Sequence, residues 1–261
     1  MSNQKVVGPQ GIVDVNNFSN RQGIEDYDLP SRGLAYTDDK GNLIFPDGKI
    51  QISPMTVAEE KMLASNAAGD GSKKLASLID RTCDLKGMLA KELLIQDVHA
   101  LIYAIRSASY GNVYPFDYEC PECKHKAQHA LNLDEHPVSY APDGFSDIVE
   151  IDLPISKSKV IMRRFRLKDE NSKSSDSGAA MFEMLSRAIT QIDDQKIMHW
   201  QVADGWLNNL LVRDRAAITK ALGGDGEEFG ISGTTTVTCA NCGHVQEGVG
   251  VPFGADFFRA D

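Results

Sequence analysis

The stretches Cys120-Pro121-Glu122-Cys123 and Cys239-Ala240-Asn241-Cys242-Gly243 contain four of the five cysteines in this 261-residue chain. Each pair lies between two β-like stretches, so each predicts a tight turn at which two thiolates meet. Two such turns together supply four sulfur ligands, which is the tetrahedral shell of a structural zinc site. The sequence therefore predicts one structural Zn²⁺ ion, bound by Cys120, Cys123, Cys239 and Cys242.

A redox centre is the main alternative for a Cys-x-x-Cys motif. Redox motifs open a helix, because the helix terminus lowers the pKa of the first thiol, and neither pair here precedes a helical period. Unbound thiols and another metal such as iron also stay open. A shell of four thiolates has no free position for a substrate, so the predicted site stabilises and does not catalyse. We expect the nearby His125, His129 and His244 to be surface groups or to support the ligands.

The spacing of the two motifs is wide, because 115 residues (124–238) separate the inner cysteines. Closing a flexible loop of this length costs about 4 kcal/mol, whereas structural zinc contributes on the order of 10–16 kcal/mol. We therefore expect a zinc ribbon split between residues 116–140 and 232–258. The ion then ties the two ends of an inserted β-hairpin and helical subdomain at residues 141–231.

The rest of the chain predicts an α+β fold, with mixed helices and short antiparallel hairpins around the split four-cysteine zinc ribbon. Residues 1–26 are polar and lack an apolar period, which predicts a flexible N-terminal arm. Residues 27–115 are expected to form a hairpin and helical region. Its hairpin is predicted at 42–53 around the turn Pro46-Asp47-Gly48.

Helices are predicted from capping and periodicity. Thr56 and Glu59 form a capping-box pattern that opens a helix to about residue 66. Apolar spacing predicts one helix around residues 75–79 and another around 98–105 that ends at Gly111. Further on, we expect a β-hairpin within 148–167, an exposed loop at 169–178, and helices near 179–192 and 205–222, the last ending at Gly223-Gly224.

Composition and charge restrict the partners. The net charge of −10 argues against nucleic acid or anionic lipid as the principal partner. The basic run from Lys157 to Lys168 is the exception, and we expect it to be a solvated strand face or a protein contact. No window approaches the roughly 18 apolar residues of a membrane span, and the N-terminus lacks the apolar core of a signal peptide. We therefore expect a cytoplasmic protein with no membrane partner.

The sequence offers no enzyme motif. The glycine-rich stretch 223–226 leads into acidic residues and not into a phosphate-binding lysine. The stretch 230–233 misses the spacing of a nucleophile elbow by one residue. We therefore expect no enzyme, no catalytic residue and no small-molecule substrate.

Four phrases in order resemble the T4-type bacteriophage baseplate protein family, over roughly residues 27–245. They are Asp28-Leu29-Pro30-Ser31-Arg32-Gly33-Leu34-Ala35-Tyr36; Ile50-Gln51-Ile52-Ser53-Pro54-Met55-Thr56 followed by Glu59-Glu60; Arg106-Ser107-Ala108-Ser109-Tyr110-Gly111; and Leu210-Leu211-Val212-Arg213-Asp214-Arg215.

The resemblance implies a tail protein of contractile-tailed phages that acts as a baseplate hub subunit or as a hub assembly factor. Its partners would be other phage baseplate and hub proteins. It would be found in the host cytoplasm during phage assembly, with the virion tail baseplate as a second location. The alternative is a regulatory zinc-ribbon module that binds nucleic acid or a polymerase, which salt-dependent binding to DNA or RNA distinguishes.

Overall fold

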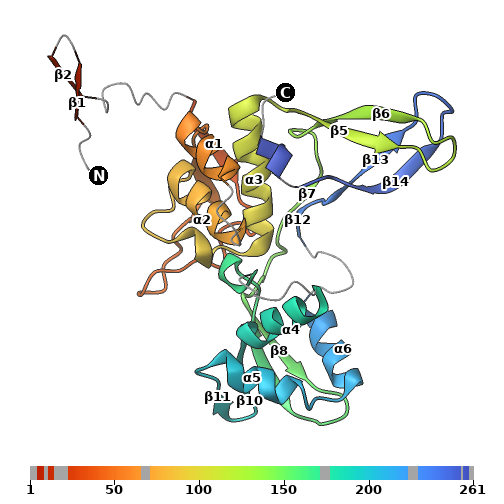
Figure 1. Cartoon of the computed structure of the whole chain (residues 1–261). Helices are drawn as coiled ribbons and strands as arrows, with labels where there is room; N and C mark the ends of the chain where they lie inside the picture. The colour runs from red at the N-terminus through yellow and green to blue at the C-terminus, as the bar shows by residue number, and fades with distance from the viewer. Residues whose placement is uncertain are drawn as a thin grey trace.

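The computed structural model describes residues 5–8, 11–14, 23–65, 71–170, 177–222, 229–253 and 255–258. It is a mixed α+β structure of helices and short antiparallel sheets, as predicted. Buried apolar side chains form two separate clusters, one around α3 and one between residues 151 and 218. Figure 1 shows the corresponding two bodies, with two long hairpins projecting from the first.

The first body surrounds α3 (Ile95–Tyr110), which is buried along most of its length. Its four predicted apolar positions are at most 1% exposed, at the helical spacing that the sequence showed; they are Val98, Leu101, Ile102 and Ile105. The helix ends where predicted, at Gly111, whose φ of 88° suits a residue without a Cβ. Around it lie α1 (Val57–Ala64), α2 (Gly71–Thr82), β3 (Glu25–Asp28) and β4 (Lys49–Ile52).

The capping box at the start of α1 is confirmed. The Thr56 hydroxyl accepts a hydrogen bond from the Ala58 amide, and the Glu59 carboxylate accepts one from the Thr56 amide at 2.8 Å. Glu59 is only 3% exposed, yet Arg81 lies 3.8 Å from its carboxylate. The predicted end of this helix, at residue 66, lies outside the described residues.

The second body holds a four-stranded antiparallel sheet in the order β11-β10-β9-β8. The predicted hairpin within 148–167 is confirmed as β8 (Ile148–Asp152) and β9 (Lys159–Arg163). The other strands are β10 (Ile189–Ile192) and β11 (Gln195–Lys196). The covering helices are α4 (Ser177–Ala188), α5 (Trp200–Leu207) and α6 (Val212–Ala221).

A small sheet beside α3 joins the two ends of the chain that forms the second body. Here β7 (Val138–Ser139) pairs with β12 (Gly230–Ile231), so the chain leaves and returns through one antiparallel pair. The His136 ring bonds the Ser232 carbonyl oxygen at 2.6 Å beside it. These contacts hold the two ends of the intervening chain together independently of the cysteines.

The predicted hairpin at 42–53 is wrong. The turn exists, because the Gly48 amide donates to the Phe45 carbonyl oxygen at 3.0 Å, but β4 after it pairs with β3 instead of residues 43–45. A Cβ on Gly48 would lie 3.1 Å from the Arg32 carbonyl oxygen. The turn thus packs against the preceding loop, which directs the chain toward β3.

Two helix predictions also need correction. The helix expected at 179–192 ends at Ala188, because Ile189 and Ile192 are buried and pair with β9. The helix expected at 205–222 is interrupted between α5 and α6. There the Asn209 side chain donates to the Gly205 carbonyl oxygen at 2.8 Å, which competes with the helical backbone. Residues 223–224, the predicted end of this helix, lie outside the described residues.

The predicted exposed loop at 169–178 is wrong at both of its described ends. Residues 169–170 belong to a short 3-10 helix, η3 (Leu167–Glu170), in which Asp169 is buried, and residues 177–178 belong to α4; residues 171–176 lie outside the described residues. The predicted arm ends too late, because Glu25 and Asp26 already pair with β4 in β3, and of the rest residues 1–4, 9–10 and 15–22 lie outside the described residues. Residues 5–8 and 11–14 form the hairpin β1–β2, which Figure 1 draws apart from both bodies. None of the described helices is long and apolar enough to cross a membrane.

Candidate metal centre

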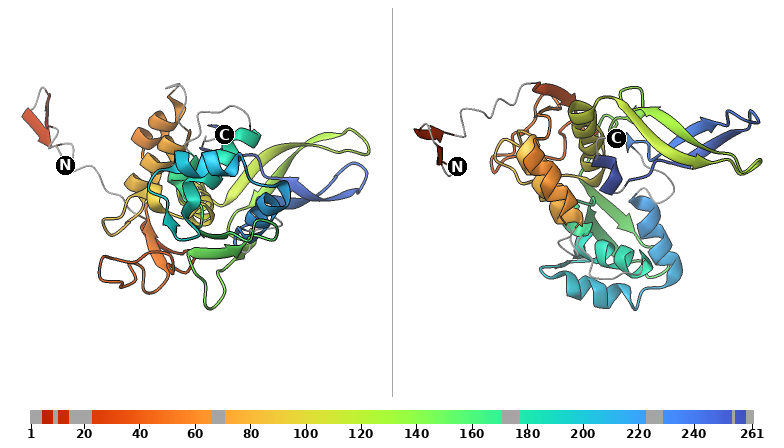
Figure 2. Two further views of the ribbon diagram at one scale, coloured as in Figure 1. Left: turned by 90° about the horizontal axis from the view of Figure 1, so that it is seen from below. Right: turned by 45° about the horizontal axis from the view of Figure 1, so that its top comes forward.

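Two hairpins that are far apart in sequence carry the four cysteines. The first consists of β5 (Val113–Glu119) and β6 (Lys126–Asn132), and the second of β13 (Thr234–Thr238) and β14 (Val245–Gly250). Figures 1 and 2 show the hairpins side by side. The Tyr118 hydroxyl joins them by donating to Gln246 Oε1 at 3.0 Å. The turn of each hairpin therefore presents its cysteines to the other.

The two cysteine turns have the same backbone hydrogen bonds. The Cys120 amide donates to the His125 carbonyl oxygen at 2.9 Å, and the Cys239 amide donates to the His244 carbonyl oxygen at 2.8 Å. Amides four residues after each first cysteine donate back to its carbonyl oxygen at 3.0 and 2.9 Å. Both turns are thus copies of one local structure, although their sequences share little beyond the cysteines.

A left-handed residue closes each turn. Lys124 has a φ of 57° and Gly243 a φ of 73°, each directly after the second cysteine of its pair. Gly243 adopts this conformation at no steric cost, whereas a residue with a Cβ, such as Lys124, is strained in it. The strain at Lys124 is acceptable where the turn is held by its hydrogen bonds and, in our proposal below, by a metal.

Two of the sulfur–sulfur distances equal those of a zinc ion bound by four thiolates, and all four sulfur atoms lie close together. All four are within 4.8 Å of one another, with Cys120 Sγ 3.8 Å from Cys242 Sγ and Cys123 Sγ 3.7 Å from Cys239 Sγ. A regular tetrahedron with Zn–S bonds of about 2.3 Å has sulfur–sulfur edges of about 3.8 Å. A disulfide would need about 2.05 Å. The residues present therefore fit a tetrahedral thiolate-bound metal.

Hydrogen bonds to sulfur favour the thiolate form that a metal binds at Cys120 and Cys123. At Cys242 the His244 amide also lowers the pKa, but hydrogen bonds shared with the other thiols outweigh it and raise the pKa to about 12. The Asn241 side-chain amide lies 3.5 Å from Cys123 Sγ, and this bond is the main reason that the pKa of Cys123 falls to about 6. The backbone amide of Cys123 chiefly lowers the pKa of the Cys120 thiol. Cys120 and Cys239 are buried and Cys242 is exposed, so the site lies at the surface end of the hairpins.

The histidines near the turns and the fifth cysteine do not belong to this group of sulfur ligands. Among the described residues, the group of potential ligand atoms comprises the four cysteines and no histidine. His129 packs edge-on against Phe116, with ring centroids 5.3 Å apart. Cys83 belongs to the core of the first body, where burial raises its pKa to about 12. A thiol this hard to ionise is a packing residue.

The basic run at 157–168 is largely paired with carboxylates. The pairs are Lys159–Glu150 at 2.5 Å, Arg163–Asp169 at 2.6 Å, Arg166–Asp147, and Lys168–Glu92 at 2.6 Å. Glu92 belongs to the 3-10 helix η2 (Ala90–Glu92) of the first body. The run thus joins the two bodies, and its paired charges offer little to a phosphate backbone. Sequence reasoning missed this role because each partner lies at a distance along the chain that no local pattern reports.

Most of the chain matches a known protein family. Residues 40–259 match the family described as T4 bacteriophage base plate protein. The match includes both cysteine pairs and both buried clusters beyond residue 40, while the phrase at 28–36 lies outside it. No curated protein and no solved structure matches the chain.

Proposed function

Because the chain belongs to the T4 bacteriophage base plate protein family, we propose that it acts in the tail baseplate by protein–protein binding, as a hub subunit or a hub assembly factor. Membership indicates a structural role in the phage and interaction with other phage proteins. The match over residues 40–259 is the observation that carries this proposal, since it spans both bodies and both hairpins. Families of this kind are generally not enzymes.

The second part of the proposal is that Cys120, Cys123, Cys239 and Cys242 hold a structural Zn²⁺ ion. The sulfur separations of 3.7 and 3.8 Å support it, as do the two matching cysteine turns. Bound zinc would fix the two hairpins as one rigid arm, because four thiolates fill its shell and leave no position for water or substrate. The chain would then resemble a zinc ribbon split by an insertion.

A rigid body with a separate N-terminal segment suits stepwise assembly. The proposed zinc holds the hairpins in one arrangement, so that binding a partner carries no further cost of ordering them. The segment before β3 would add contact area on binding. In this view the protein enters the hub as a preformed unit in the host cytoplasm and adds its arm there.

The test is complementation of a phage whose own copy of this gene is inactivated. Supplied proteins would be the full chain, a variant lacking residues 1–22, and a control lacking only residues 1–4. The deletion stops at residue 22 because Glu25 already pairs with Ile52 in β3–β4. Hubs and baseplates would be counted by electron microscopy, and the folding of each variant checked by circular dichroism.

We expect the 1–22 deletion to fold normally and to lower the yield of hubs, while the control restores it. Normal hub yield with the 1–22 deletion would overturn the arm mechanism, and normal tails without any copy of the protein would overturn the baseplate function. Mass spectrometry of finished particles beside assembly intermediates separates the two roles. A hub subunit is expected in both, and an assembly factor only in the intermediates.

A further inference from the structure

A small hollow opens in the first body beside β3. Its volume is about 250 Å³, and Glu25, Asp26 and Tyr27 of β3, Tyr103 of α3, Asp134 and Tyr140 contribute to its walls. Pockets for drug-sized ligands run from about 300 to 1,000 Å³. This hollow therefore has the size to receive one long side chain of another protein, and not a cofactor.

The charge around the hollow is negative and uncompensated. Glu25 and Asp26 are exposed and have no ion-pair partner among the residues that the structure describes. Asp134 accepts a hydrogen bond from the Ser107 hydroxyl at 2.8 Å, which leaves its charge in place. The described residues that line the hollow include no lysine or arginine. An arriving cation would therefore meet carboxylates in this wall without displacing a resident cation.

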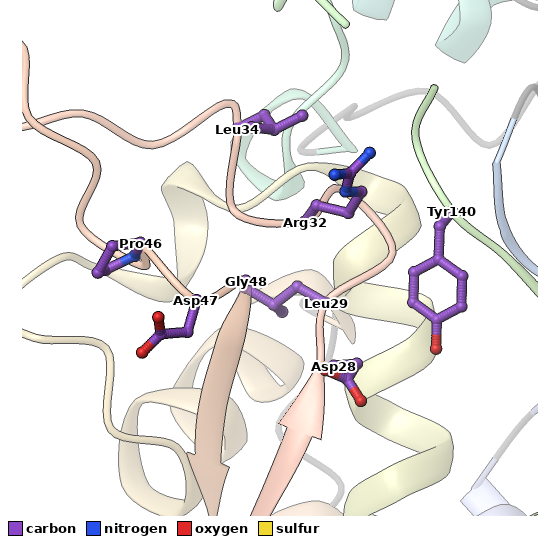
Figure 3. A pocket seen from close by; sticks show the side chains of 8 residues that line it. All are labelled: Asp28, Leu29, Arg32, Leu34, Pro46, Asp47, Gly48 and Tyr140. Carbon is purple, nitrogen blue, oxygen red and sulfur yellow. The ribbon is translucent and has the colours of Figure 1, made fainter. Parts of the chain in front are cut away.

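The neighbouring hollow, drawn in Figure 3, shows the contrast. It shares Tyr140, which faces Asp28 across its edge, but two of its three charged lining residues, Asp28 and Arg32, are ion-paired, and the third is Asp47. Arg32 lies 2.7 Å from Asp143, and Lys49 lies 3.3 Å from Asp28. The first hollow differs because its described lining residues include carboxylates but no lysine or arginine, whereas Arg32 lines the neighbouring one.

Aromatic rings complete the first hollow. The Tyr103 ring stacks on His136 with centroids 5.6 Å apart and an interplanar angle of 7°, which fixes its orientation. Burial, and then the adjacent Tyr140, raise the pKa of Tyr27 above its ordinary value, so its hydroxyl stays protonated. Tyr140 is 49% exposed and stands at the opening. Tyrosine faces attract cations, most strongly where water is partly excluded.

The protein already holds one arginine of its own in such surroundings. The Arg106 guanidinium lies 4.9 Å from the Tyr114 ring centroid and 5.3 Å from that of Tyr110. A guanidinium suits these surroundings because it is planar, stacks on rings and forms two parallel hydrogen bonds with a carboxylate. An ammonium is a compact, strongly hydrated charge and gains less from the same walls.

We propose that this hollow is a docking site for an arginine side chain of a neighbouring baseplate protein. The proposal deepens the protein–protein function above and rests on it. The arginine would stack between Tyr27, Tyr103 and Tyr140 and pair with the carboxylates of Glu25, Asp26 or Asp134. It thereby assigns the chemistry of the partner, a segment that presents arginine to the β3 side of the first body.

The test titrates the full-length protein with the synthetic peptide acetyl-Gly-Arg-Gly-Arg-Gly-amide, and with the same peptide carrying lysine for arginine. Binding is followed by NMR of isotope-labelled tyrosines. The test variant is Glu25→Gln/Asp26→Asn/Asp134→Asn, in which the amide oxygen introduced at position 134 can still accept from Ser107. The matched control, Asp39→Asn/Asp117→Asn/Asp194→Asn, removes the same charge from exposed carboxylates elsewhere. Circular dichroism checks that both fold.

We expect saturable shifts at Tyr27, Tyr103 and Tyr140 with the arginine peptide, and weaker ones with the lysine peptide. The test variant should bind about tenfold more weakly, which corresponds to ~1.4 kcal/mol, and the control less than about twofold more weakly. Equal losses in both variants, or no saturable shift at these tyrosines, would overturn the proposal. Complementation by the test variant separates it from the proposed function: normal hubs despite lost peptide binding would reject the docking site alone.

Discussion

Replacing Cys239 by serine removes one sulfur from the proposed metal centre. The sequence and the structure predict that different parts of the chain are destabilised by this substitution. The sequence predicts that the ion ties the ends of the insertion at residues 141–231, so that losing the ion loosens the insertion. In the structure, β7 and β12 already hold those ends through Val138–Ser139 and Gly230–Ile231. The effect of Cys239→Ser should therefore fall on the hairpins and spare the second body.

The magnitude follows from the loop that the ion alone closes. With β7 and β12 paired, the free path between the cysteine turns shortens to roughly 25 residues, for which the logarithmic rule gives about 3 kcal/mol. The full insertion would have given about 4 kcal/mol. We expect a loss of at least about 3 kcal/mol in the local stability of β5–β6 against β13–β14, because the closure cost is no longer offset by zinc binding, with little change elsewhere.

Metal analysis and hydrogen exchange measure this directly. The wild-type chain, purified without chelator, should contain one zinc per chain, and Cys239→Ser well below one. Amides in residues 113–132 and 234–250 should exchange faster in the variant, while those of β8, β9 and β10 should not. Cys83→Ala is the matched control, since it removes the cysteine that lies in the core away from the centre, and its zinc content should equal that of the wild type.

Two results would refute the reasoning. Unchanged zinc content in Cys239→Ser would mean that this sulfur is not a ligand. Faster exchange throughout residues 141–231 would mean that the ion, and not the β7–β12 pair, holds the insertion closed.

Three further predictions concern stability, each measured by urea unfolding. Burial raises the pKa of Asp97, so the folded state holds the carboxyl proton more tightly than the unfolded state does. The protonated carboxyl therefore contributes to the free energy of unfolding fully below the unfolded pKa of about 3.9, and this contribution is lost as pH rises through the folded pKa. Asp97→Asn should remove that decline, and parallel pH profiles would contradict it. Arg163→Ala should lower the free energy of unfolding by about 3–5 kcal/mol, because the Asp169 side chain, only 1% exposed, loses its ion-pair partner. Lys159→Ala, which breaks the exposed pair with Glu150, should lower it by at most about 1 kcal/mol. Equal losses in the two variants would contradict this. Gly33→Ala should lower the free energy of unfolding by more than about 1–2 kcal/mol, since φ is +71° and the added Cβ would lie 2.5 Å from the Phe45 carbonyl oxygen. Unchanged stability would show that residue 33 does not pack this closely against Phe45.

Local sequence patterns suffice to predict an element where that element depends on residues close together in the chain. The capping box of Thr56 and Glu59, the apolar face of α3 and the stop at Gly111 were predicted because each depends on neighbours within a turn or two of helix. The hairpin of β8 and β9 was predicted for the same reason. Residues 189–192 were assigned to a helix because their apolar spacing fits both structures, and pairing with β9 decides for a strand.

One part of the cysteine centre depends on local sequence and the other on tertiary packing. The spacing of each pair is local and predicts a turn that presents two sulfurs. That the two turns meet, with sulfurs 3.7 and 3.8 Å apart, depends on the packing of hairpins more than one hundred residues apart in sequence. The acidic hollow was not predicted at all, because its walls come from β3, α3 and the segment at 134–140, and no sequence pattern joins them.

By itself, the sequence determined the two cysteine turns, the helix boundaries set by capping and glycine, and the resemblance to a baseplate family, because these depend on residues close together or on phrases kept in order. Only the tertiary structure decided that β4 pairs with β3, that β7 and β12 close the insertion, and that the basic run joins the two bodies through carboxylates. The physical reason is that competing strand pairings offer similar backbone hydrogen bonds. Burial of side chains from distant parts of the chain, such as Leu29, Phe45 and Ile50, then selects among them.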